Sequence, residues 1–392
     1  AALLAHGRIL LMDGKYEEAL AALQKAASAD PKSAGVYYYL GLAQRSLGLW
    51  EPARSSFASA LERDPRLTEA SVALSALTIK GGSQNESLRL ADNALKTEPE
   101  LPSGYLARAR ALIAKGDLKQ GDAALQEALR REPASLPALA ALVSLASTQG
   151  RIREVLPRIS GLLEHDPRNA GLHFLLALCY FNLNDLNRSE ASLSQALAID
   201  PKTPQAHPLL ANIDFARGNT EKAKAELRTA IAVSPRTISS YSALGTQYEK
   251  ERNWDEAKKL FEKAHEIDPS SPYIAAELAF LYLEHGGDVN FAVSLAQSVK
   301  QRIPNSPIAA DVLGWAYYKL GSVGSAVKQL REAAQREPAN PMYQYHLGMA
   351  YMALRRFDLA RRSLQSALKT DPHFLQAADA KLAMDQLSKR LD

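Results

Sequence analysis

The sequence predicts an all-α protein built from stacked helical pairs, and three regularities lead to this prediction. Prolines that end a helix recur every 34 residues from Pro31 to Pro269 without slippage. Glycines stand near the middle of most of these intervals. Apolar residues follow a helical period, and neither alternating polarity nor hairpin signals indicate a strand. The chain of 392 residues is therefore predicted to be one repeating array.

Residues 238–271 show the repeating unit most fully. Each of its two helical segments carries apolar or small residues on one face at a period of about 3.6 residues. In order, these residues are Tyr241, Leu244, Gly245, Tyr248, Trp254, Ala257, Phe261 and Ala264. Asp268-Pro269 ends the second helix, because proline lacks the amide and clashes with the preceding turn. Ser271-Pro272 begins the next helix with a capping side chain and a proline at the first helical position.

This unit resembles the tetratricopeptide repeat, in which an aromatic residue, Leu-Gly, Tyr, Ala, Phe, Ala and Pro recur over 34 residues. The prolines in the last of these places are Pro31, Pro65, Pro99, Pro133, Pro167, Pro201, Pro235, Pro269, Pro304, Pro338 and Pro372. They divide residues 1–372 into eleven repeats, of which the first lacks its opening residue. The resemblance implies a right-handed α-solenoid of about eleven helix pairs.

The turn inside each pair is expected to need a left-handed residue, which glycine adopts without penalty. The glycines at this place are Gly14, Gly48, Gly82, Gly116, Gly150, Gly218, Gly287 and Gly321. Repeats six, eight and eleven have Asn184, Arg252 and Arg355 instead, and the arginines suggest a slightly different turn. Small residues where two helices cross, such as Gly245 opposite Ala257, are expected to let the backbones approach.

Repeat five, residues 136–169, departs from these rules. Val143, Val155 and Leu162 occupy the small positions, and Pro157 falls inside the second helix. We expect the bulk to push the two helices apart and the proline to kink or shorten one of them. The repeat is either a degenerate unit with compensating substitutions or a change of pitch between repeats 1–4 and 6–11.

The segment 373–392 is predicted to form a capping helix over about 373–390. Its apolar residues would cover the last repeat while polar residues face solvent, which is what the end of a repeat array needs. The covering residues are predicted to be Phe374, Ala377, Ala378 and Met384.

Composition and motifs point away from catalysis. The net charge of +4 is too small to imply a nucleic-acid partner. The single cysteine, Cys179, lies in an apolar helical stretch and is expected to be buried. No histidine or cysteine pattern has metal-ligand spacing, and no phosphate-binding or nucleophile motif occurs. We therefore expect a non-enzymatic protein with no cofactor and no metal site.

No apolar run approaches the roughly 20 residues that a membrane-spanning helix needs. Ala1 already falls inside a repeat, so we expect the chain to be trimmed at its start, and a targeting segment could precede it.

The resemblance also implies that the first helices line a concave surface where a partner binds. The inward positions are the fifth, ninth and twelfth of each repeat. From these we predict the partner-binding residues Tyr38, Leu42, Arg45, Arg110, Phe174, Phe181, Asn212, Phe215, Phe280, Trp315, Tyr318, Tyr345, Met349 and Met352. Large aromatic residues and methionines anchor interfaces. The alternative is that they fill space between neighbouring first helices.

The predicted function is a scaffold that holds protein or peptide segments in its concave groove. Two alternatives stay open: a component of an export machinery that contacts polysaccharide, and the repeat region of a larger enzyme. The segments 311–321 and 343–352 resemble late repeats of bacterial proteins of exopolysaccharide export and PEP-CTERM systems. That resemblance favours a bacterial protein with an extracytoplasmic, periplasmic location. The sequence does not determine the oligomeric state.

Overall fold

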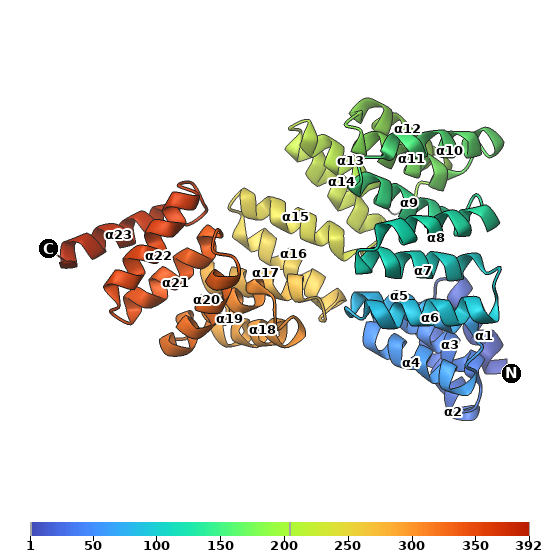
Figure 1. Ribbon diagram of the computed structural model, residues 1–392, viewed down its shortest axis with the longest axis horizontal. Helices are drawn as coiled ribbons and strands as arrows, with labels where there is room; N and C mark the ends of the chain where they lie inside the picture. The colour runs from blue at the N-terminus through green and yellow to red at the C-terminus, as the bar shows by residue number, and fades with distance from the viewer. Residues whose placement is uncertain (1, 204, 392) are drawn as a thin grey trace. The chain divides into compact units, whose positions relative to one another are not determined.

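The computed structural model describes residues 2–203 and 205–391, which form 23 helices and no strand (Figure 1). The chain divides into two compact units, Ala1–Ser234 and Pro235–Asp392. The sequence had not predicted this division. The assignment of 1–372 to one array and of 373–392 to a separate cap stays a prediction, as does the right-handed stacking.

The first unit contains fourteen helices within the described residues. They are α1 (Ala2–Met12), α2 (Tyr16–Ala29), α3 (Ala34–Ser46), α4 (Trp50–Arg63), α5 (Thr68–Lys80), α6 (Gln84–Thr97), α7 (Pro102–Lys115), α8 (Leu118–Arg131), α9 (Leu136–Thr148), α10 (Ile152–His165), α11 (Ala170–Asn182), α12 (Leu186–Ile199), α13 (Ala206–Ala216) and α14 (Thr220–Val233).

The second unit contains nine helices within the part of the chain that the structure describes. They are α15 (Ile238–Lys250), α16 (Trp254–Ile267), α17 (Pro272–Glu284), α18 (Val289–Arg302), α19 (Pro307–Lys319), α20 (Val323–Arg336), α21 (Pro341–Ala353), α22 (Phe357–Thr370) and α23 (Ala377–Leu391).

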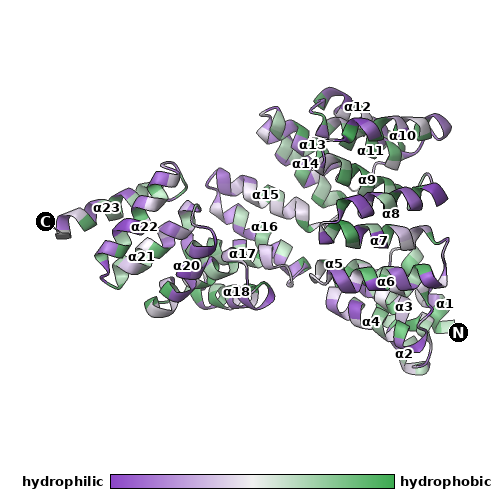
Figure 2. Cartoon of the chain, viewed as in Figure 1, coloured by the Kyte–Doolittle hydropathy of each residue, from purple (hydrophilic) through white to green (hydrophobic). Residues whose placement is uncertain are grey.

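Within each unit, every odd-numbered first helix packs against the second helix that follows it, and each second helix packs against the next first helix. Hydrophobic and hydrophilic residues occur together on the helices (Figure 2), and the hydrophobic ones supply most of the buried core. This arrangement is an α-solenoid, as the sequence predicted, because no single pair can bury its own apolar face.

Small residues at the helix crossings do bring the backbones together. A Cβ atom added to Gly41 would lie 2.6 Å from the Phe57 ring, and one added to Gly245 would lie 2.8 Å from the Phe261 ring. Both rings are fully buried. In repeat three the crossing is polar, and the hydroxyls of Ser75 and Ser87 lie 2.8 Å apart.

The turns inside the pairs confirm the left-handed conformation and correct two details. Arg252 and Arg355 adopt φ angles of 58° and 57°, close to the 60° of Asn184. The prediction of a different turn at the arginines was therefore wrong. In repeat nine the left-handed residue is Gly286, with φ of 83°, and not Gly287. Gly287 instead lies against the Tyr282 ring, where a Cβ atom would clash.

Repeat five is loosely paired, as its bulky crossing residues predicted. Fewer residues of α9 and α10 lie close together than in any other pair of this kind. A pocket of about 210 Å³ lies between α8, α9 and α10. Pro157 does not shorten α10, which runs for 14 residues. The compact unit continues through this repeat.

The last helix, α23, packs on α22 but begins at Ala377, four residues later than predicted. Phe374 and Ala377 are buried as predicted, whereas Ala378 is exposed and Met384 only half-buried. The residues that the sequence missed are Ala380, Ala383 and Leu387, which are buried. Ala377, Ala380, Ala383 and Leu387 recur every three to four residues and form the buried face of α23.

Candidate functional site

A pocket of about 410 Å³ lies in the second unit and is lined mainly by its first helices, α15, α17, α19 and α21. Among the lining residues, Glu249, Phe280 and Asp311 hold the twelfth, ninth and fifth positions of successive repeats. These are the positions predicted to face a partner. The pocket therefore lies on the face that the repeat register selects.

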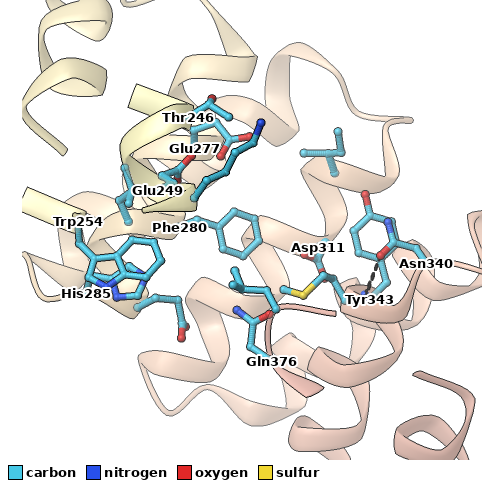
Figure 3. Close-up of a pocket in the computed structure, with 16 residues that line it drawn as sticks. Thr246, Glu249, Trp254, Glu277, Phe280, His285, Asp311, Asn340, Tyr343 and Gln376 are labelled. Atoms are coloured by element: carbon cyan, nitrogen blue, oxygen red, sulfur yellow. Dashed lines mark hydrogen bonds between the residues drawn. The ribbon is translucent and has the colours of Figure 1, made fainter. Parts of the chain in front are cut away.

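The wall of the pocket is largely apolar. Phe280 projects into its centre, with Trp254 and His285 on one side and Tyr343 on the other (Figure 3). The Trp254 and His285 rings stack with centroids 3.6 Å apart and an angle of 5°. Burial lowers the pKa of His285, which favours its neutral form.

The mouth of the pocket carries exposed apolar side chains. Ile308 is 45% exposed and Leu375 is 65% exposed, and both line the pocket. Ile308 lies in the first turn of α19, and Leu375 in the segment that joins α22 to α23.

Four carboxylates line the pocket, and two of them have partners within the unit. Glu284 lies 3.0 Å from the Lys319 ammonium and accepts a hydrogen bond from the Trp315 indole. Asp311 lies 2.9 Å from Nδ1 of His346, and both side chains are 1% exposed. These two carboxylates therefore hold the pocket wall together.

The other two carboxylates, Glu249 and Glu277, lie near each other at one end of the pocket (Figure 3). Burial, together with the nearby charge of Glu277, raises the pKa of Glu249 to about 7. Burial also raises the pKa of Glu277. Two carboxyl groups, which repel each other when both are ionised, thus lie close together in a partly buried part of the pocket.

An aromatic cluster adjoins the pocket through Phe280 and contains several of the predicted partner-binding residues. The Trp315 ring stacks on His346 at 4.1 Å and on Tyr318 at 4.6 Å. The Phe280 ring stacks on the same His346 ring, with centroids 5.7 Å apart. Tyr345 lies 6.1 Å from Trp315. The structure thus brings Phe280, Trp315, Tyr318 and Tyr345 together.

Members of this cluster differ in their access to solvent. Trp315 is 2% exposed and Tyr345 is 6% exposed. Phe280 and Tyr318 are half-buried, and so are Met349 and Met352, the other two predicted residues of this unit. Trp315 and Tyr345 therefore pack inside the unit, as the alternative of space filling between first helices expects. The binding role of the whole set stays a prediction.

The predicted residues of the first unit form separate local groups. Tyr38 and Leu42 pack partly buried against a cluster around Phe57. Phe174 and Phe181 pack against a cluster around Leu193. The remaining members are the half-buried Phe215 and the exposed Arg45, Arg110 and Asn212. Their part in binding also stays a prediction.

Sequence reasoning missed the acidic end of the pocket and its stacked wall. Glu277 occupies the sixth position of its repeat, which the register does not mark as inward. Trp254 belongs to a second helix and His285 follows the end of a first helix. No sequence pattern joins these residues, because their meeting depends on how successive repeats stack.

The helical pairs and the first-helix pocket define an α-solenoid of the type that is typical of protein–protein interaction scaffolds. A family model of the tetratricopeptide repeat protein 21 C-terminal ARM domain matches residues 118–317. Three tetratricopeptide-repeat models match residues 7–48, 36–66 and 312–381. The chain belongs to the tetratricopeptide-repeat family.

One curated relative is the TPR repeat-containing protein YpiA of Bacillus subtilis (strain 168). It is 22% identical over 183 residues, which is 47% of this chain and 43% of YpiA. The chain thus spans less than half the length of this relative.

Two solved structures are similar. The APC/C hetero-tetramer Cut9–Hcn1 contains a chain with 16% identity and a TM-score of 0.54, and the match covers 98% of this chain and 83% of that one. The yeast Tom70 structure has 16% identity and a TM-score of 0.40, over 100% of this chain and 88% of that one. The likeness to the Cut9–Hcn1 chain supports the solenoid fold.

The described residues contain neither a metal-binding cluster nor a membrane-spanning helix. No group of three histidine, cysteine, aspartate or glutamate side chains is arranged to hold a metal ion in that part of the chain. None of the helices of the described residues combines the length and the apolar content that crossing a membrane requires.

Proposed function

We propose that the chain is a non-enzymatic scaffold that binds a segment of a partner protein on its first-helix face. The pocket of the second unit is one docking point. The observation that carries this proposal is the pair of exposed apolar side chains, Ile308 and Leu375, at the mouth of a pocket of about 410 Å³. Apolar side chains gathered around a pocket favour a partner that covers them.

Two further observations support a protein partner. The family is generally non-catalytic and serves as a scaffold, and its arrays bind segments laid along the first helices. The similar chain of known structure was solved in the hetero-tetramer Cut9–Hcn1, which is an assembly of different proteins.

The groove that the sequence predicts extends this proposal to the first unit. Its exposed or half-buried members there, such as Tyr38, Arg45 and Arg110, would contact other parts of the same partner. Once one part of the partner is bound, the other contacts form at a high effective concentration, so several weak contacts together would raise the affinity.

The test measures how one surface substitution changes binding. A partner captured by the wild-type protein is purified and titrated calorimetrically against wild type, Ile308→Asp and Leu382→Asp. Leu382 is a matched control because it is 58% exposed on α23 and does not line the pocket. We expect Ile308→Asp to weaken binding by about 10-fold or more and Leu382→Asp to leave it unchanged.

Equal binding by wild type and Ile308→Asp would contradict the proposed docking point. Circular dichroism checks that both variants keep the helical content of the wild type, which is expected because both side chains are exposed.

The polysaccharide alternative has less support. Sugar stacking needs accessible aromatic faces, whereas Trp315 is 2% exposed and Tyr345 is 6% exposed. The periplasmic location stays a prediction, and fractionation of source cells with an antibody to the chain tests it.

A further inference from the structure

Two carboxylates in the pocket have no partner among the described residues. Glu249 comes from the last turn of α15 and Glu277 from the middle of α17. Neither forms a hydrogen bond or an ion pair there, whereas the other acids of the pocket, Glu284 and Asp311, do. Lys250 also lines the pocket, but its side chain is exposed and pairs with neither acid. The unpaired ionisable side chains of the pocket are therefore mainly acidic.

The pKa values report how unfavourable this arrangement is for the empty protein. Burial raises the pKa of both acids, and the charge of Glu277 raises that of Glu249 further, to about 7. A cation placed between them would remove both the repulsion and part of the cost of burial.

The surrounding wall suits a long aliphatic side chain with a charged end. Phe280 lies at the centre of the pocket and Trp254 on one side, and aromatic faces attract cations as well as methylene groups (Figure 3). Burial lowers the pKa of His285 and so favours its neutral imidazole, which would not repel a bound cation. A metal ion would lack ligands, because the described residues hold no group of three acids or histidines arranged for one.

We propose that the pocket binds a lysine or arginine side chain of the partner segment. The carboxylates of Glu249 and Glu277 pair with its charge, and Phe280 and Trp254 contact its aliphatic stem. Apolar residues of the partner that flank its lysine or arginine cover Ile308 and Leu375. This inference rests on the proposed function, that a partner segment binds on the first-helix face.

The experiment begins from an unbiased set of peptides. A display library of random 12-residue peptides is selected on the wild-type protein, and binders that also bind Ile308→Asp are removed. We expect lysine or arginine to be enriched at one position of the remaining peptides.

A selected peptide and its norleucine analogue then measure the charge itself. We expect replacement of the cation by norleucine to weaken binding to the wild type by about 10- to 100-fold. On the double variant Glu249→Gln/Glu277→Gln the two peptides should bind about equally. Glu256→Gln, at a half-buried position on α16 outside the pocket, should keep the wild-type difference.

The possible results separate the two proposals. Peptides that depend on Ile308 but carry no enriched cation, or a norleucine analogue that binds as tightly, would overturn the cationic occupant and leave the scaffold in place. A library that yields no peptide dependent on Ile308 would overturn both. The norleucine comparison on the wild type decides the question even if the double variant fails to fold.

Discussion

Among single residues, Glu249 departs most from its ordinary chemistry. Its pKa is raised to about 7 by burial and by Glu277, and the phenol of Tyr273 and the ammonium of Lys250 are the other titratable groups nearby. The folded state therefore binds a proton that the unfolded chain releases between pH 4.5 and about 7. Stability is predicted to fall as pH rises through this window, because the folded state there still holds a proton that the unfolded chain has released.

The variant Glu249→Gln should remove most of that dependence. We expect it to be more stable than the wild type by about 1–3 kcal/mol at pH 8 and nearly equal to it at pH 4. Urea unfolding at the two pH values measures this. Glu256→Gln serves as the control, and an identical gap for Glu249→Gln at both pH values would contradict the prediction.

Glycine at a helix crossing has a measurable role. In Gly245→Ala the new Cβ would lie 2.8 Å from the buried Phe261 ring. We expect a loss of about 1–3 kcal/mol in the free energy of unfolding. At Gly324, in the first turn of α20, the added Cβ would meet no atom within 4 Å beyond its chain neighbours and its own helical backbone. Gly324→Ala should therefore stabilise the protein by about 0.5–1 kcal/mol. Opposite signs in urea unfolding are the expected result, and two stabilising substitutions would argue against a tight crossing.

At the scale of the helix, α10 shows what the repeat tolerates. Pro157 lies inside it, where proline lacks the amide that would bond to the carbonyl of Arg153. The helix nevertheless keeps its 14 residues, since its buried face continues through Ile152, Val155 and Ile159. Packing of the apolar face thus outweighs the local cost of proline.

Removing this proline should stabilise the helix. We expect Pro157→Ala to raise the free energy of unfolding by about 1–3 kcal/mol, because the side chain is exposed and no packing is lost. Pro52 is the matched control, since it is exposed and lies in the first turn of α4, where amides have no intrahelical partner. Pro52→Ala should change stability by less than about 0.5 kcal/mol. A similar effect of both substitutions in urea unfolding would contradict the argument.

At the scale of the whole molecule, Cys179 can report whether the first unit opens, because it belongs to a buried apolar cluster of that unit. Its thiol is fully buried in α11, and burial raises its pKa to about 12. The thiolate that reacts with disulfide reagents is therefore scarce in the folded protein. Access to it requires the unit to open.

This gives a direct measure of opening. We expect Cys179 of the native protein to react with an aromatic disulfide reagent at least about 100-fold more slowly than Cys179 of the protein unfolded in guanidinium. The variant Cys179→Ala/Ser194→Cys carries the thiol at an exposed place on α12 and should react rapidly when folded. Fast labelling of native Cys179 would mean that the first unit opens readily.

The sequence alone determined the helical repeat. A 34-residue spacing of prolines, left-handed turn residues and small crossing residues all act within a repeat or between neighbouring helices, so local chemistry is enough to predict them. The tertiary structure alone decided the division after Ser234, the burial of Trp315 and the meeting of Glu249 with Glu277. These features depend on how successive repeats stack, and the angles of stacking arise from side-chain packing that no single repeat contains.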